Sequence, residues 1–384
     1  MSQRYRTIEH VISRSHIRKY SRATASGQDG ELDLRIKQYV PLDNPTPIAG
    51  DLTIMAADGS DSPKEPYEPL WDDVLQLCDE KDAHVRSIWI ADVAHQGGSC
   101  IRTKRKLGND QSWFDHCRDL LHMVNNFRDQ LPRLIIGIGH SMGAGQLVLM
   151  HPRLLHSLVL LEPVIGKRTK PCQGPRLTRA PTLRKDTALS RADAVHAAEK
   201  SLQSWDNRHG FRELPTVAVP ENTIPGAQKG DGRTPSIAKA NRLPPPDIIG
   251  PAGTITTCYR QEPVLATVGP RHVRPSILYV FGFRSLLSCP GRIEDKLTRT
   301  EFCARGSGGQ KDGRVQAAIN PVCAHLVSLV AVAQVAAAVV PWLMKEAAKW
   351  RADGRKVATG WAEKSLRKKT TVNDEWFSKV KSLR

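Results

Sequence analysis

The chain has 384 residues, of which 40% are hydrophobic and 25% are charged. These proportions are typical of a globular protein with a sizeable core and exclude an intrinsically disordered chain. The formal net charge of +17 favours anionic partners such as phosphate-bearing substrates, although charge bears on association and not on fold.

The cysteines and the two ends of the chain indicate a compartment. The eight cysteines form no CxxC pair and have no metal-ligand spacing, so we expect neither a metal site nor a disulfide framework. The N-terminal sequence MSQRYRTIEH lacks the apolar segment of a signal peptide, which favours a reducing, intracellular environment. The last residues, KSLR, approach a peroxisomal SKL-type address but do not keep its order, so that signal is absent as written.

The first half of the chain alternates short apolar runs with helical segments. Residues 32–40 (LDLRIKQYV) alternate apolar and polar side chains and predict a half-buried edge strand. Later runs are apolar on both faces, at residues 52–57, 85–92, 134–141 and 157–164. Helical periodicity separates them at residues 67–80 and 112–131. Such strands predict a mainly parallel sheet with helices on both faces.

The second half loses this regularity and then recovers it. Residues 167–274 are rich in proline, glycine and basic side chains and predict a partly irregular lid or insertion. A strand at 276–282, a weak strand RVQAAIN and an apolar segment at 326–344 follow. That last segment is nearly long enough to cross a bilayer, but Gln334, Pro341 and its many alanines favour a buried core helix. We therefore do not expect a membrane association.

The predicted organisation has four parts. Residues 1–166 form the N-terminal part of the core, 167–274 the insertion, 275–350 the C-terminal part of the core and 351–384 a basic C-terminal tail.

A G-x-S-x-G pentapeptide stands between a strand and a helix. The segment LIIGIGHSMGAG places Ser141 after an apolar run, with Gly139 and Gly143 two residues away on either side. In an α/β-hydrolase this sequence forms a strained turn that presents the serine as a nucleophile, and the small residues prevent collisions. The backbone N–H of Met142 is then an oxyanion donor. The pattern predicts that Ser141 is a nucleophile; a polar residue at a strand end is the alternative.

A serine nucleophile requires a base and an acid, which follow it along the chain in this fold. His325 comes after the last predicted strand and before the last helix, so we expect it to be the base. His140, beside the serine, is predicted to be a packing or pocket residue. Two carboxylates compete as the acid: Glu162, at the end of a predicted strand, and Asp295, in a helix-like segment RIEDKL. Burial at a strand end favours Glu162.

Several segments together resemble a known group of proteins. They include EHVISRSHIRKYSRATA, PKEPYEPLWDDVL, RSIWIADVAHQG, GIGHSMGAGQLVLMHPRL and SILYVFGFRSLLS. The sequence resembles the fungal peroxisomal α/β-hydrolases, which include hydrolases of AK-toxin-type toxin clusters and of mycophenolic acid biosynthesis. The resemblance covers roughly residues 8–215 and 274–380. It implies an α/β-hydrolase fold, a family acid at Glu162 and a family histidine at His325.

The same resemblance implies a substrate and a location. It implies cleavage of an acyl-CoA thioester or ester in secondary metabolism, without a cofactor, in the peroxisome or otherwise in the cytoplasm. A basic lid suits the phosphates of coenzyme A, with Lys167, Arg168 and Lys170 as first candidates. The chain is also a possible homo-oligomer.

The oxyanion segment leaves a second function open. Ala57 and Asp58 occupy the position of a family segment resembling His-Ala-Asn-Gly, and an acidic residue there opposes an oxyanion. The alternative is therefore a weakened or inactive homologue that acts as a pathway scaffold or binding protein. Nucleic acid binding is not expected, because the sequence has no aromatic-rich reader motif.

Overall fold

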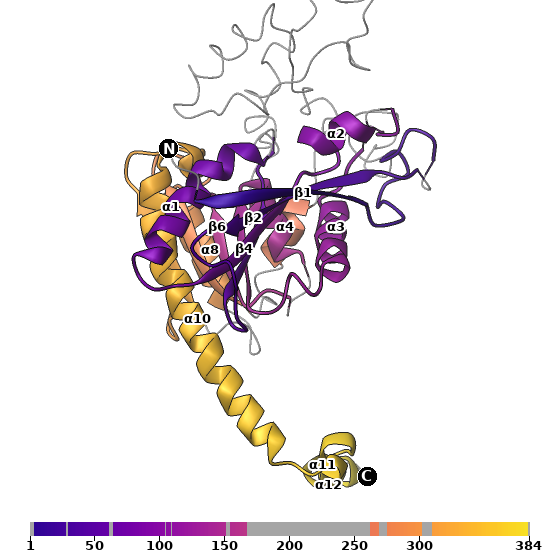
Figure 1. Ribbon diagram of the computed structural model, residues 1–384, viewed down its shortest axis with the longest axis vertical. Coiled ribbons are helices and arrows are strands. Elements are labelled where there is room, and N and C mark those ends of the chain that lie inside the picture. Colours follow the sequence, from indigo (N-terminus) through magenta and orange to yellow (C-terminus); the bar gives the residue numbers. More distant parts are fainter. Residues whose placement is uncertain are drawn as a thin grey trace, which may run out of the picture.

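A single mixed sheet organises the protein. The computed structural model describes residues 4–27, 30–60, 64–103, 105–108, 110–150, 154–166, 262–268, 275–301 and 309–382. In this part of the chain, eight strands pair in the order β1-β2-β4-β3-β5-β6-β7-β8 (Figure 1). Their bounds are β1 Tyr5–Ser13, β2 Asp33–Pro41, β3 Leu52–Ala57, β4 Val85–Ala91, β5 Ile135–His140, β6 Ser157–Leu161, β7 Ser276–Gly282 and β8 Val315–Asn320.

The strands from β4 across to β8 run parallel, as their apolar sequences predicted. The prediction that residues 32–40 form the edge was wrong, because β2 pairs with β4 on one side and with β1 on the other, antiparallel in both cases. The edge strand on this side of the sheet is β1, which its sequence did not reveal, and β8 forms the opposite edge. The side chains of β1 are mostly half-exposed or exposed, so β1 lacks the apolar run that marks the inner strands.

Helices cover both faces of the sheet. Their bounds are α1 Glu68–Asp79, α2 Gly97–Thr103, α3 Trp113–Asn126, α4 Met142–Val148, α7 Glu262–Val268, α8 Pro290–Glu301, α9 Val327–Val330, α10 Val332–Ala362, α11 Leu366–Thr370 and α12 Asp374–Lys381, with a 3₁₀ turn η1 at Glu65–Tyr67. The buried side chains form two cores, one against α1 and α10 and the other against α3 and α4. Strand β4 shows the division, since Ile88 and Ile90 belong to the first core and Trp89 to the second.

The apolar segment at 326–344 is a core element, as predicted. It is divided into α9 and α10, and Val335, Val339 and Val340 of α10 are buried against the sheet. The second half of α10 projects away from the body with α11 and α12, and α10 runs across the predicted domain boundary at residue 350 (Figure 1). Among the described residues, no helix combines the length and hydropathy that a bilayer crossing requires.

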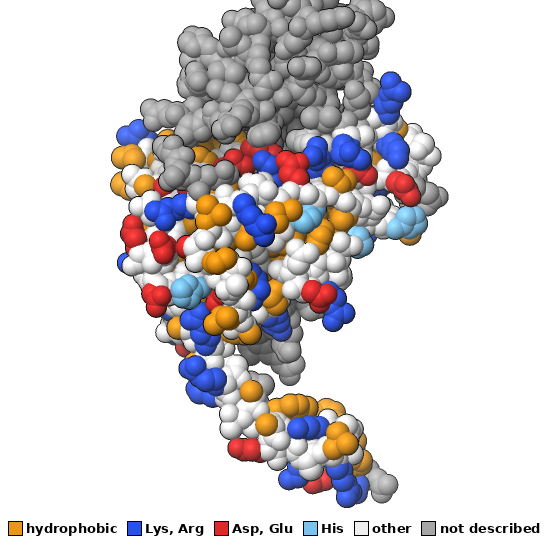
Figure 2. Space-filling model, in the orientation of Figure 1, with side chains coloured by type: hydrophobic (Ala, Val, Ile, Leu, Met, Phe, Trp, Pro, Cys, Tyr) orange, Lys and Arg blue, Asp and Glu red, His pale blue; other side chains and the backbone are white. Residues whose placement is uncertain are grey.

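Basic and acidic side chains are interspersed on the face of the described residues that Figure 2 shows. On the face shown in Figure 2, Lys and Arg side chains are spread over the body and the C-terminal helices, with acidic side chains among them. The basic segment 167–185 and the rest of the predicted insertion, apart from α7, lie outside the described residues.

Candidate active site

The backbone at Ser141 adopts a conformation that non-glycine residues rarely take. Ser141 joins β5 to α4 with φ 53° and ψ −110°. A positive φ is disfavoured for a residue with a Cβ, so the surroundings must hold it in place. Two backbone hydrogen bonds do so: the Ser141 N–H donates to the Leu161 carbonyl at 2.9 Å, and the Val164 N–H donates to the Ser141 carbonyl at 3.1 Å.

The two glycines of the pentapeptide are required for steric reasons. A Cβ on Gly139 would lie 2.7 Å from the Ala144 Cα. A Cβ on Gly143 would overlap the backbone carbonyls of Ala57 and Asp58. The first turn of α4 therefore packs directly against the end of β3, which places the two predicted oxyanion segments side by side.

The structure brings together the three residues that the sequence analysis selected as a triad. The Ser141 Oγ lies 2.8 Å from the His325 Nε2, and the His325 Nδ1 lies 3.3 Å from the Glu162 Oε2. An ionised carboxylate only accepts hydrogen bonds, so the His325 Nδ1 carries the proton and its Nε2 can accept from the serine hydroxyl. This is the arrangement in which an imidazole can act as a general base.

Glu162 is fully buried at the end of β6 and has a positive φ of 47°. Its Oε1 accepts the Gly282 N–H at 2.6 Å and also accepts the Ser288 hydroxyl. Burial alone would raise the pKa of Glu162, but hydrogen bonds from His325, Ser285, Ser288 and the Gly282 N–H outweigh it and lower the pKa. The carboxylate is therefore ionised at neutral pH although no solvent reaches it.

The competing carboxylate occupies a different kind of position. Asp295 lies on α8 and pairs with Arg299 at 2.7 Å, one helical turn away. About a third of its side chain is exposed (34%). This is the surface helix that the RIEDKL sequence indicated, and the buried strand end at Glu162 supplies the carboxylate next to His325.

The oxyanion segment carries less negative charge than its sequence suggested. Burial, and then the neighbouring Asp92, raise the pKa of Asp58 well above its usual value and favour the neutral acid. Gln96 holds the segment in place, because its side-chain amide donates to the Asp58 Oδ2 and the Gly59 carbonyl, both at 3.2 Å. Met142 begins α4, and the first N–H groups of a helix have no acceptor within that helix.

The sequence analysis missed the partners of His140. This side chain is buried and lies 2.7 Å from the Tyr67 hydroxyl and 3.0 Å from the His325 carbonyl oxygen. His140 lines a pocket, in agreement with the expected packing or pocket residue, and it also makes these two hydrogen bonds. A histidine directly before the nucleophile, together with a tyrosine in the segment after β3, was the available signal.

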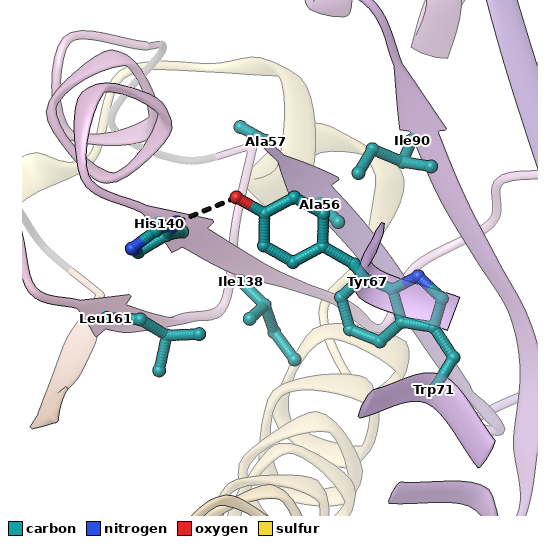
Figure 3. Close-up of a pocket in the computed structure, with 8 residues that line it drawn as sticks. All are labelled: Ala56, Ala57, Tyr67, Trp71, Ile90, Ile138, His140 and Leu161. Atoms are coloured by element: carbon teal, nitrogen blue, oxygen red, sulfur yellow. Dashed lines mark hydrogen bonds between the residues drawn. The ribbon is translucent and has the colours of Figure 1, made fainter. Parts of the chain in front are cut away.

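The pocket beside His140 is too small for a substrate. It lies between the sheet and α1, and its walls are largely apolar (Figure 3). It has no room for a water molecule. The pocket is the packed floor of the site. The predicted substrate-binding residues Lys167, Arg168 and Lys170 lie outside the described residues.

Comparisons with known proteins place this site in a family. No family model matches the chain. The type I acyl-CoA thioesterase mpaH of Penicillium brevicompactum is 32% identical, in an alignment that covers all of this chain and 96% of the relative. The chain belongs to the mpaH family of fungal α/β-hydrolases. A second mpaH thioesterase, from Penicillium roqueforti, is 30% identical over the same shares of the two chains.

A yeast protein is similar to part of the chain in sequence and to most of it in fold. The peroxisomal membrane protein LPX1 of Saccharomyces cerevisiae is 29% identical over 30% of this chain. The solved structure of the peroxisomal α/β-hydrolase Lpx1 matches with a TM-score of 0.67 and 19% identity, and covers 97% of this chain and all of that chain. This match confirms the predicted α/β-hydrolase fold and, with the mpaH relatives, the predicted family.

Proposed function

We propose that the protein is a serine hydrolase that cleaves an acyl-CoA thioester or ester, with Ser141 as nucleophile, His325 as base and Glu162 as acid. The observation that carries this proposal is the continuous hydrogen-bonded contact from the Ser141 Oγ through His325 to the buried Glu162 carboxylate. Membership of the mpaH family, whose relatives are named acyl-CoA thioesterases, supports the thioester substrate.

The geometry suits acyl transfer to water in two steps. The Ser141 Oγ attacks the substrate carbonyl carbon while the His325 Nε2 takes the serine proton, and Glu162 stabilises the resulting imidazolium. The imidazolium then gives its proton to the departing thiolate or alkoxide. In the second step His325 takes a proton from water, which attacks the acyl carbon; the acyl–Ser141 bond then breaks, the imidazolium returns its proton to the Ser141 Oγ, and the acid leaves.

The developing oxyanion requires hydrogen-bond donors on the opposite side of the carbonyl. We assign this role to the backbone N–H of Met142 and to the segment at Ala57, which the close contact at Gly143 holds beside it. Loss of one such donor costs about 10²- to 10³-fold in rate in comparable sites. Because burial favours a neutral Asp58, this segment is compatible with that role.

The finer features of the function rest on the family. We propose that the substrate belongs to a secondary-metabolite pathway of the toxin type and that the enzyme works in the peroxisome. Lys167, Arg168 and Lys170 are our candidates for binding the phosphates of coenzyme A.

Labelling with a fluorophosphonate probe, together with hydrolysis assays on acyl-CoA thioesters and simple esters, tests the proposal. We expect the wild type to label, Ser141→Ala to lose the label, and Ser141→Ala and His325→Ala each to lower hydrolysis by at least about 10³-fold. His84→Ala, at a largely exposed histidine, is the matched control and should behave as wild type. If the wild type, Ser141→Ala and His325→Ala showed the same labelling and hydrolysis, the proposed enzyme function would be wrong. The alternative, a pathway scaffold or binding protein, would then remain.

A further inference from the structure

A chain of hydrogen bonds connects the oxyanion segment to the backbone of His325. The Gly59 N–H donates to the Tyr67 hydroxyl at 2.9 Å, and this hydroxyl lies 2.7 Å from the His140 Nδ1. On the other side of the ring, the His140 Nε2 lies 3.0 Å from the His325 carbonyl oxygen. Tyr67 comes from the end of η1 and His140 from the end of β5. These hydrogen bonds therefore connect the segment after β3 with the loop of His325, across the carboxyl end of β5.

The proton positions in this chain are determined by its two ends. The His325 carbonyl only accepts, so the His140 Nε2 must carry a hydrogen. In a neutral ring the Nδ1 then accepts, and the Tyr67 hydroxyl donates to it while accepting from the Gly59 N–H. One tautomer therefore satisfies every group in the chain.

The environment of His140 keeps its ring neutral. Burial, and then the charge of the neighbouring His325, lower the pKa of His140 to about 3. The two rings are close, with centroids 5.4 Å apart. When His325 takes the serine proton, His140 consequently remains uncharged and its hydrogen bonds remain in place.

The contact between Tyr67 and His140 is dry in the native protein. Figure 3 shows the Tyr67 hydroxyl directed at His140, with the apolar side chains of Ala57, Ile138 and Leu161 around the pair. The enclosed space does not admit a water molecule. A variant that removes either partner leaves a polar group without a replacement, which is costly in a dry site.

We propose that His140 and Tyr67 are positioning residues, which hold the His325 loop so that the imidazole meets Ser141. The inference rests on the proposed function, because it takes His325 to be the base. His140, the residue before Ser141, would thereby hold His325 in place through a hydrogen bond to the backbone carbonyl of His325. The side chain of His325 is one third exposed (33%), so packing alone does not enclose it.

Three variants separate hydrogen bonding from packing. His140→Leu keeps a buried side chain but removes both hydrogen bonds. His140→Gln restores a donor that can reach the His325 carbonyl, and Tyr67→Phe removes only the hydroxyl. His116→Leu and Tyr39→Phe are matched controls, since both side chains are buried and lie on α3 and β2, away from Ser141. The Tyr39 hydroxyl bonds Glu68 at 3.1 Å.

The readouts are kcat and KM, and the rate of fluorophosphonate labelling per titrated active site. We expect His140→Leu to lower kcat and the labelling rate by about 10²-fold with little change in KM, because misplacing a catalytic group by about 1 Å has an effect of that size. His140→Gln should have a kcat at least about tenfold higher than that of His140→Leu. The kcat of Tyr67→Phe should lie between the values of the wild type and His140→Leu. The controls should change thermal stability but keep the rate per active site within about twofold.

Two results would overturn the inference. One is a His140→Leu enzyme that reacts at the wild-type rate per active site, and the other is an equal loss in His116→Leu. An unlabelled, inactive wild type would instead contradict the proposed function. Imidazole ¹⁵N NMR of the wild type tests the hydrogen bonds independently of activity: a proton on the His140 Nε2 that persists between about pH 5 and 9 supports the contact with the His325 carbonyl, and a proton on Nδ1 overturns the inference even in an active enzyme.

Discussion

The ionic cluster next to β1 and the polar network at Ser141 are both buried, but their charges are compensated in different ways. The ionic cluster consists of Arg14, Arg18, Asp115 and Asp119, between the end of β1 and α3. Asp119 bonds Arg14 at 2.6 Å and Arg18 at 2.9 Å, and both guanidinium groups are almost fully buried. Each charge in the cluster therefore has an opposite charge beside it.

The site network has a carboxylate without a permanent cation in contact with it. Among the described residues, the ion pair assigned to Glu162 is with His325, and it exists only when that ring is protonated. The charge of Glu162 is otherwise balanced by hydrogen-bond donors and, without direct contact, by the buried ammonium group of Lys296, whose charged form Glu162 favours. Fully paired charges thus attach β1 to the body, whereas under the proposed mechanism the pair of Glu162 and His325 forms only when His325 takes the serine proton, where it would stabilise the transition state.

Removal of the negative charge of Glu162 should have the largest effect on kcat. Glu162→Gln keeps the shape of the side chain but cannot stabilise the imidazolium, so kcat should fall by about 10³- to 10⁴-fold with folding retained. Steady-state kinetics on the best substrate and circular dichroism measure the two effects. Asp295→Asn removes the same charge on α8 and is the control. Equal losses in both variants would contradict the assignment of the acid.

A matching change in the ionic cluster should affect stability and not catalysis. Asp119→Asn leaves Arg14 and Arg18 buried without their shared partner, and breaking a buried pair of this kind costs about 3–5 kcal/mol of unfolding free energy. Urea denaturation measures this loss, while kcat per titrated active site should stay close to wild type. Glu375→Gln, at an exposed pair with Lys379, should cost less than about 1 kcal/mol. A catalytic defect in folded Asp119→Asn would remove the distinction between the two regions.

The buried histidines should make folding sensitive to acid. Burial, with the neighbouring Arg14, lowers the pKa of His116 to about 3, and burial with His325 does the same for His140, from an ordinary value of 6.5. Below that ordinary value the unfolded chain binds protons that the native protein does not, so stability falls as pH falls from about 6.5 toward 3.

Each histidine contributes at most about a tenfold change in the folding equilibrium per pH unit. Urea midpoints recorded between about pH 4 and 7 measure the slope, which His116→Leu and His140→Leu should each reduce. An unchanged slope in both variants would show that neither ring stays neutral in the native protein.

The smallest effect is expected at the oxyanion segment. If Asp58 is a neutral acid in the native protein, Asp58→Asn replaces it with a group of the same size and charge, and kcat should change by less than about threefold. Kinetic assays at neutral pH test this. A large rise in kcat would mean that a negative charge at residue 58 opposes the oxyanion in the wild type.

The sequence predicted the parallel part of the sheet because β3 to β7 are short apolar runs, and helices follow β3, β4, β5 and β7 along the chain. The same order placed Ser141 and Glu162 at the ends of β5 and β6 and His325 in the loop after β8, and the structure brings their side chains together. The prediction failed at β1, where a strand paired on one side keeps mostly exposed side chains and has no apolar signature.

The hydrogen-bonded chain through His140 could not be predicted by spacing. Tyr67 and His325 are 73 and 185 residues away from His140 along the chain. The three residues meet only in the folded protein, at the carboxyl end of β5. The raised pKa of Asp58 likewise depends on burial, which its own sequence segment does not reveal.

The extension of α10 offers a practical means of handling the enzyme. Residues 358–368 and 370–382 are exposed, and Figure 1 shows this end of the chain directed away from the sheet. A biotin or a dye coupled at this end would stand apart from the nucleophile. Single molecules could therefore be tethered to a glass surface with their chemistry undisturbed.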